Sequence, residues 1–150
     1  MKKRKQTRLD GFEYKQNYTY HVIICTKDKQ LFFKNKDNAR ELHDIVNKED
    51  EINSVNIYAH SVMYDHIHIL INLQEEYKKK LSEWVRDFKR LVSRRLKKIN
   101  LWQKNYYDHI MRTFEDIKQT ALYIVNNPVR KGYVENWEDY EFSGINYKDE

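Results

Sequence analysis

The chain has 150 residues, of which 40% are hydrophobic, and its formal net charge is +5. This length and apolar content predict a globular fold with a buried core and exclude a globally disordered chain. The sequence contains neither a Gly-rich dinucleotide motif nor a phosphate-binding loop motif, which removes the usual nucleotide-cofactor classes. Cys25 is the single cysteine, so an intrachain disulfide and a cysteine-based zinc site are excluded.

We expect residues 1–150 to form a single domain, with a basic tail at about residues 1–14. The first residues are basic but no apolar segment follows them, so we expect no signal peptide. The sequence also lacks a run of roughly 20 apolar residues that would cross a bilayer. These features predict a soluble, cytoplasmic protein without a membrane partner.

Apolar periodicity predicts the first four elements. Alternation predicts a strand over residues 18–26, and helical spacing predicts a short helix over residues 37–48. Two further strands are expected over residues 53–63 and 66–73. The short link between these two strands predicts an antiparallel hairpin.

The second half of the chain predicts two more helices and one strand. A long helix is expected from about Tyr77 to Ile99, followed by a strand over residues 105–112. A final helix is expected near Thr113, where a capping-box pattern occurs, and it should end before Pro128. The order β-α-β-β-α-β-α indicates an α+β fold, a ferredoxin-like antiparallel sheet with helices packed on it.

Positive charge is concentrated in the long predicted helix, where residues 78–98 contain ten Lys and Arg residues against two acidic ones. Such a stripe is commonly no more than a solvated helix face. It is also typical of a site for a nucleic-acid backbone. Our candidates for backbone contacts on this helix are Arg86, Lys89, Arg90 and Arg94.

The segment Tyr64–Ile71 places His66 and His68 two residues apart in an apolar, β-branched run. Because side chains alternate along a strand, both imidazoles project from one face and the isoleucines from the other. Two neutral imidazoles supply two ligands of a metal site. Half-buried structural histidines are the alternative, so the interpretation depends on finding a third ligand and a nucleophile.

Tyr123 and Asn127 lie four residues apart on the final predicted helix, one turn above the other. They are off the apolar stripe, so this helix should display a phenol and an amide on a second face. If that face meets the histidine side of the sheet, two imidazoles and an amide oxygen surround a cation with a phenol beside it.

This set of groups suits phosphodiester cleavage. A tyrosine is mostly neutral at pH 7 and needs activation before it attacks. A divalent ion on the scissile phosphate supplies Lewis-acid stabilisation and orients the phosphorus for in-line attack. Mixed imidazole and amide ligation suits Mg²⁺ or Mn²⁺.

Three separated motifs resemble those of a known family. His66-Ile67-His68 is similar to the His-hydrophobic-His signature of the single-tyrosine HUH transposases. The patterns Trp102-Gln103, Tyr107-Asp108-His109-Ile110 with Arg112, and Tyr123-Ile124-Val125-Asn126-Asn127-Pro128-Val129-Arg130-Lys131-Gly132 resemble the REP-associated tyrosine transposase branch. The resemblance covers roughly residues 15–145. Tyr64 departs from it, since many relatives have proline there.

The resemblance implies that Tyr123 is the nucleophile, that His66 and His68 bind the metal, and that Asn127 is the third ligand. It also implies action on single-stranded DNA near a hairpin, through a 5′-phosphotyrosine intermediate that leaves a free 3′-OH. Further candidate DNA contacts are His109, Arg112 and Arg130. Related enzymes exchange the tyrosine helix between two subunits and shorter forms act alone, so a homodimer and a monomer both fit the sequence.

Other assignments stay open at this point. Tyr106 and Tyr107 are the fallback nucleophiles, and Asn127 has a helix-capping role as its alternative. His21, His43 and His60 are expected to be structural.

Two rival functions also stay open. One is a non-catalytic module that binds single-stranded nucleic acid on the same fold, with structural histidines. The other is a metal-dependent hydrolase that acts through bound water and forms no covalent adduct.

Overall fold

The computed structural model describes residues 18–146, so the basic tail at residues 1–14 lies outside the described residues. Its centre is a five-stranded antiparallel sheet with the strand order β4-β1-β3-β2-β5. The strands are β1 (Tyr18–Cys25), β2 (Val55–Val62), β3 (His66–Leu73), β4 (Tyr107–Met111) and β5 (Ser143–Ile145). The α+β antiparallel architecture expected from the sequence is confirmed.

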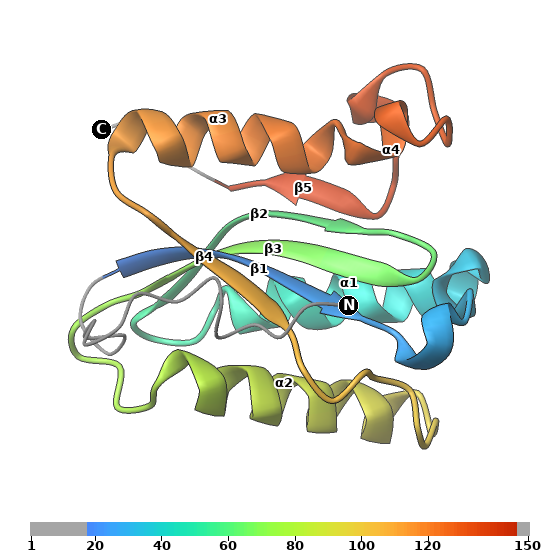
Figure 1. Ribbon diagram of the computed structural model, residues 1–150, viewed down its shortest axis with the longest axis horizontal. Coiled ribbons are helices and arrows are strands. Elements are labelled where there is room, and N and C mark those ends of the chain that lie inside the picture. Colours follow the sequence, from blue (N-terminus) through green and yellow to red (C-terminus); the bar gives the residue numbers. More distant parts are fainter. Residues whose placement is uncertain (1–17, 147–150) are drawn as a thin grey trace.

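Helices cover both faces of this sheet (Figure 1). α1 (Lys36–Glu49) and α2 (Leu81–Arg95) lie on one face, and α3 (Phe114–Val125) lies on the other, followed by the single-turn α4 (Asn127–Arg130). Short 3₁₀ turns occur at η2 (Lys27–Lys29), η3 (Phe32–Lys34) and η4 (Trp137–Asp139). Of the helices between residues 18 and 146, none combines the length and apolar character that a membrane span requires.

Side chains alternate between the two faces of the central strands, so buried apolar residues form two separate clusters, one on each face of the sheet. Ile67, Ile69 and Ile71 of β3 pack with α1 and α2 in the main core. The opposite face of the same strand carries Leu70, which packs with Ala121 and Ile124 of α3 in a smaller cluster. The even-numbered side chains of β3 therefore face α3, which meets the condition on which the predicted site depends.

The predicted start of α3 is confirmed, whereas the predicted ends of α2 are wrong. Thr113 caps α3 as expected, because its side chain accepts a hydrogen bond from the Asp116 amide at 3.0 Å. α2 is shorter than the expected span from Tyr77 to Ile99. It stops because Lys97 adopts a left-handed conformation (φ 52°) and the Lys98 amide bonds back to the Ser93 carbonyl, an ending usually signalled by glycine.

Candidate active site

The imidazoles of His66 and His68 lie side by side on the α3 face of β3. Their Nε2 atoms are 3.1 Å apart. His68 is buried with 5% of its surface exposed, whereas 19% of the His66 side chain is exposed. The pair thus points two ring nitrogens at one position, with His66 on the solvent side.

Each of these imidazoles is held through its other ring nitrogen. His66 Nδ1 lies 2.7 Å from a carboxylate oxygen of Asp65. His68 Nδ1 lies 2.9 Å from Nε2 of His21 on β1, and the two rings stack with centroids 5.1 Å apart. Partners of this kind orient metal-binding histidines and fix their tautomer. The contact of His21 with His68 depends on the pairing of β1 with β3, which local sequence patterns do not reveal, so from the sequence alone His21 is expected to be structural.

Burial keeps the imidazoles of His68 and His21 neutral. It lowers the pKa of His68 well below the ordinary 6.5, and interactions with His21, His66 and the nearby Arg130 act in the same direction. Burial, with a contribution from His109, lowers the pKa of His21 to about 4. Neutral rings have the lone pairs that metal binding requires.

The geometry of the pair fits a divalent metal. Two nitrogens that bind one ion at about 2.1 Å in adjacent positions are themselves about 3 Å apart, which agrees with the 3.1 Å observed. Between residues 18 and 146 there is no group of three His, Cys, Asp or Glu side chains that could hold a metal. Further ligands would therefore be an amide oxygen, water or substrate.

Tyr123 lies beside the histidines and belongs to the same chain. Ala121, Ile124 and Val125 form the buried side of α3, which leaves Tyr123 with 51% of its surface exposed. The centroid of its ring is 6.4 Å from that of His68 and 6.4 Å from that of His21, with edge-on orientations. The phenol is thus accessible and close to the buried histidines.

Asn127 is placed differently from the prediction of an amide displayed beside the phenol. It is the first residue of α4 and is buried, with 6% of its surface exposed. Its Oδ1 accepts a hydrogen bond from Arg130 at 2.9 Å, and its Nδ2 is buried without a hydrogen-bond partner. The prediction was wrong about exposure because α3 ends at Val125 and the chain then starts a new turn.

Arg130 joins Asn127 to the tyrosine. The same Nη2 atom donates to the Tyr123 carbonyl oxygen at 2.6 Å. The guanidinium carbon also lies 3.9 Å from the centroid of the Tyr123 ring, in a cation–π contact. Arg130 therefore holds positive charge against the phenol ring.

Two further predicted residues lie on or next to β4. His109 pairs directly with His21 across the strands and is exposed. Arg112 is exposed just before α3. Of the two fallback tyrosines, Tyr106 is buried in the main core with 5% exposure, and Tyr107 is half-buried on β4.

The basic residues of α2 lie on the other face of the sheet from Tyr123 (Figure 1). Arg86 pairs with Asp87 at 3.4 Å, and Lys89 donates to the carbonyl oxygens of Gln103 and Lys104 at 2.7 and 3.0 Å. Arg90 and Arg94 are exposed. These cations are thus separated from the histidine site by the thickness of the sheet.

Comparisons with known proteins agree with this arrangement. The profile of a family described as "Transposase IS200 like" matches residues 14–127. An uncharacterized protein of Haemophilus influenzae (strain Rd) is 27% identical over 159 residues, covering 84% of this chain and 88% of that protein. A REP-associated tyrosine transposase of Escherichia coli (strain K12) is 31% identical over 87 residues, covering 58% of this chain and 52% of that protein.

A solved structure of a REP-associated tyrosine transposase bound to a REP hairpin has the same fold, with a TM-score of 0.74 and 23% identity. The match covers 91% of this chain and 81% of that chain. Since the family profile spans β1 to the end of α3 and includes both the paired histidines and the tyrosine helix, the chain belongs to the IS200-like transposase family.

Proposed function

We propose that this protein cleaves single-stranded DNA and transfers the strand through a covalent 5′-phosphotyrosine on Tyr123, with Mg²⁺ or Mn²⁺ as its metal. One observation carries the proposal. The Tyr123 ring is 6.4 Å from the ring of His68, whose Nε2 lies 3.1 Å from that of His66. An accessible phenol beside two convergent imidazoles supplies a nucleophile next to two metal ligands, which suits metal-assisted phosphoryl transfer.

The proposed reaction exchanges one phosphodiester for another. The Tyr123 oxygen forms a bond to phosphorus, and the bond from phosphorus to O3′ breaks with its electron pair on O3′. The phenol loses its proton to water, and O3′ gains a proton to become the free hydroxyl. A divalent ion held by His66 and His68 would stabilise negative charge on the phosphate and orient it for in-line attack.

Arg130 has a supporting role in this proposal. Its contact with the Tyr123 ring places a positive charge against the phenol, close to where the scissile phosphate would bind. Asn127 remains the proposed third ligand. Since Arg130 already donates to Asn127 Oδ1, ligation would use the second lone pair of that oxygen or displace Arg130.

The proposed DNA substrate contains a hairpin, because a structural neighbour is described as bound to a REP hairpin. His109 and Arg112 are proposed phosphate contacts on the exposed side of β4. Tyr123 and both histidines come from one chain, so a second copy is not needed to complete the site.

Covalent capture tests the proposal. Incubation with Mg²⁺ or Mn²⁺ and single-stranded DNA from the region flanking the gene should give a protein–DNA adduct on a denaturing gel. Tyr123→Phe should abolish the adduct and keep DNA binding, because it removes only the attacking oxygen. Tyr107→Phe, a matched loss of one hydroxyl on β4, should leave the adduct unchanged. A chelator added before the DNA should prevent the adduct from forming.

Each other result identifies a different function. An adduct that persists in Tyr123→Phe assigns the attack to another residue. Cleaved DNA without an adduct indicates the water-dependent hydrolase, and binding without cleavage indicates the non-catalytic module.

A further inference from the structure

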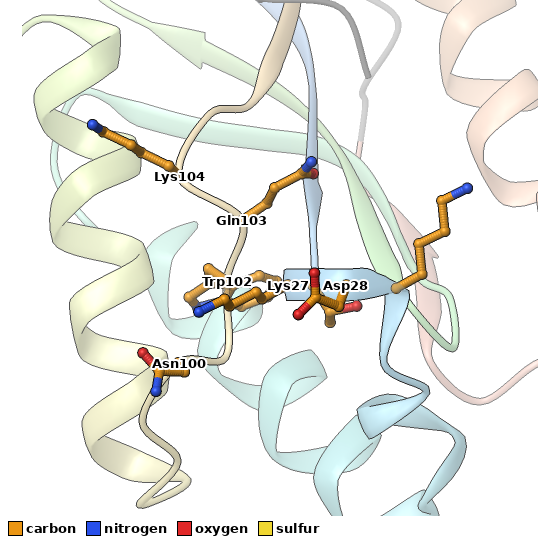
Figure 2. Close-up of a pocket in the computed structure, with 8 residues that line it drawn as sticks. Lys27, Asp28, Asn100, Trp102, Gln103 and Lys104 are labelled. Carbon is orange, nitrogen blue, oxygen red and sulfur yellow. The ribbon is translucent and has the colours of Figure 1, made fainter.

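A cavity of about 670 Å³ lies where the segment after β1 meets the segment between α2 and β4. Lys27 and Asp28 line it from the first segment, and Asn100, Trp102 and Gln103 from the second (Figure 2). Small-molecule pockets have volumes of about 300 to 1,000 Å³. The cavity is therefore large enough for one nucleotide.

The two walls are fastened to each other by backbone hydrogen bonds. The Lys27 amide donates to the Leu101 carbonyl at 2.8 Å, and the Gln103 amide donates to the Cys25 carbonyl at 2.9 Å. The Gln30 side chain adds bonds to two carbonyl oxygens of the second segment, at 3.1 and 3.2 Å. The pocket is thus formed before any ligand arrives, which reduces the entropic cost of binding.

Polar groups in these walls are left without partners. The Trp102 Nε1 donor and the Gln103 Oε1 acceptor are both buried and form no hydrogen bond. Buried polar groups normally find partners, so we expect a buried water behind the pocket surface to supply these two atoms. Asp28, Lys29 and Asn100 also have left-handed backbones, with φ of 56°, 56° and 55°. Such strain concentrates at ligand sites, and a lysine accepts it less readily than Asp or Asn.

The charges of the pocket favour a base over a bare phosphate. Lys27, Lys29 and Lys104 surround it and suit the phosphates of a DNA strand. Asp28 would repel a phosphate, but its carboxylate accepts hydrogen bonds from the exocyclic amino group of a base. A pocket with both kinds of group matches a nucleotide whose base points inward and whose phosphates meet the lysines.

The pocket is connected to the proposed active site through hydrogen bonds between Thr26 and Asp65. Thr26, in the pocket wall, donates to the Asp65 carbonyl oxygen from its amide at 2.9 Å and from its hydroxyl at 3.0 Å. The carboxylate of Asp65 in turn holds His66. The pocket wall and the proposed metal ligand His66 are therefore linked through one residue, Asp65.

We propose that this pocket binds one unpaired base with an exocyclic amino group (adenine, cytosine or guanine) in the strand that is cleaved at Tyr123. The site would select the DNA sequence next to the cleaved bond. This inference rests on the proposed function for the identity of the strand, whereas the base preference itself is independent of cleavage.

Binding without metal tests the base preference. The probes are a fluorescent oligothymidylate and the same strand with one central adenine, cytosine or guanine, all measured in chelator so that no cleavage occurs. At least one substitution should tighten binding about fivefold or more, the gain expected for a well-placed base contact. Asp28→Asn should reduce this gain, because an amide oxygen accepts hydrogen bonds more weakly than a carboxylate, and it should keep the fold, because Asn tolerates the left-handed backbone. Asp44→Asn, the same change at an exposed position of α1, should retain it.

Tryptophan NMR locates the bound base. The indole N–H signal of Trp102 should shift when the preferred strand is added. The signal of Trp84 should stay in place, because its indole already donates to Glu49 at 2.9 Å. A Trp102 signal that does not move would overturn the proposal.

Two binding results would also overturn it. In one, all four strands bind equally. In the other, Asp28→Asn strengthens binding to every strand alike, which would identify a phosphate site. Absence of an adduct in the covalent capture assay would instead contradict the proposed function. It would not affect the test of base preference, because binding is measured without cleavage.

Discussion

His21 lies behind the proposed metal ligand, and its position determines which nitrogen of His68 is free. For His68 Nε2 to bind a metal, His68 must carry its proton on Nδ1 and donate it to His21 Nε2 across the observed 2.9 Å. Asp65 has the corresponding position behind His66, at 2.7 Å. The two ligands are thus oriented by one carboxylate and one imidazole.

We expect His21→Leu to weaken metal binding about 10- to 100-fold, the usual effect of losing such a partner. His21→Gln should retain most of the affinity, because its amide oxygen can accept the same proton. Mn²⁺ binding measured by electron paramagnetic resonance checks this without relying on activity. Unchanged binding in His21→Leu, with the fold intact by circular dichroism, would contradict the assignment.

At the scale of elements, apolar alternation predicts which face of the sheet each side chain of a regular strand occupies. It does not predict where an irregularity moves the following side chains to the opposite face. A β-bulge between Ile57 and Ala59 shifts the register of β2. Beyond it Ala59 faces α3, whereas His60 turns to the other face and contacts His43 of α1. No local sequence pattern marks this bulge, so the contact between His43 and His60 could not be predicted and both were expected only to be structural.

In the candidate site, too, features set by the local periodicity of a strand or helix could be predicted, whereas contacts between distant segments could not. The shared face of His66 and His68 follows from the period of a strand, and the exposure of Tyr123 follows from the period of a helix. The contacts of His21 and Arg130 could not be predicted, because they depend on strand order and on the turn after Val125. β5 was also missed, since Ser143–Ile145 is too short to have a periodic pattern.

The contact between His60 on β2 and His43 on α1 predicts that the free energy of unfolding depends on pH. Burial, followed by the effect of His43, lowers the pKa of His60 to about 3, against 6.5 for an ordinary histidine. As pH falls from about 6.5 towards 3, the unfolded chain gains a proton at this position while the folded chain does not. The stabilising contribution is therefore complete above pH 6.5 and is lost progressively below it.

We expect the free energy of unfolding of the wild type to fall by about 2 kcal/mol more than that of His60→Gln between about pH 6.5 and 4.5. Denaturant titrations of both proteins across this range measure the difference. Parallel curves would mean that His60 is protonated in the folded state as readily as in the unfolded one.

At the scale of the whole molecule, the sheet separates two positively charged regions. One contains Arg112, just before α3, and Arg130 of α4, and the other contains the basic residues of α2, which lies on the opposite face of the sheet from α3 (Figure 1). β4 is one edge of the sheet, and the segment Asn100–Lys104, which precedes it in the chain, is paired with the end of β1 through a bridge between Thr26 and Trp102. A second cavity, lined by Lys89 and Arg90 together with this segment, adjoins the base pocket. The single-domain organisation, with its basic tail, stays a prediction.

We expect a strand that contacts α2 and also reaches Tyr123 to pass around the β4 edge, because the cavity beside Arg90 and the base pocket share their lining there. If it does, Arg90→Gln combined with Arg94→Gln should reduce the slope of log affinity against log salt by about 1.4, since each lost phosphate contact contributes about 0.7 for single strands. Lys36→Gln combined with Lys48→Gln removes the same charge from exposed positions of α1 and should leave the slope unchanged. Fluorescence anisotropy in chelator over a range of salt concentrations gives both slopes. Equal slopes in the two double variants and the wild type would make the α2 stripe a solvated surface and confine the DNA to the tyrosine side of the sheet.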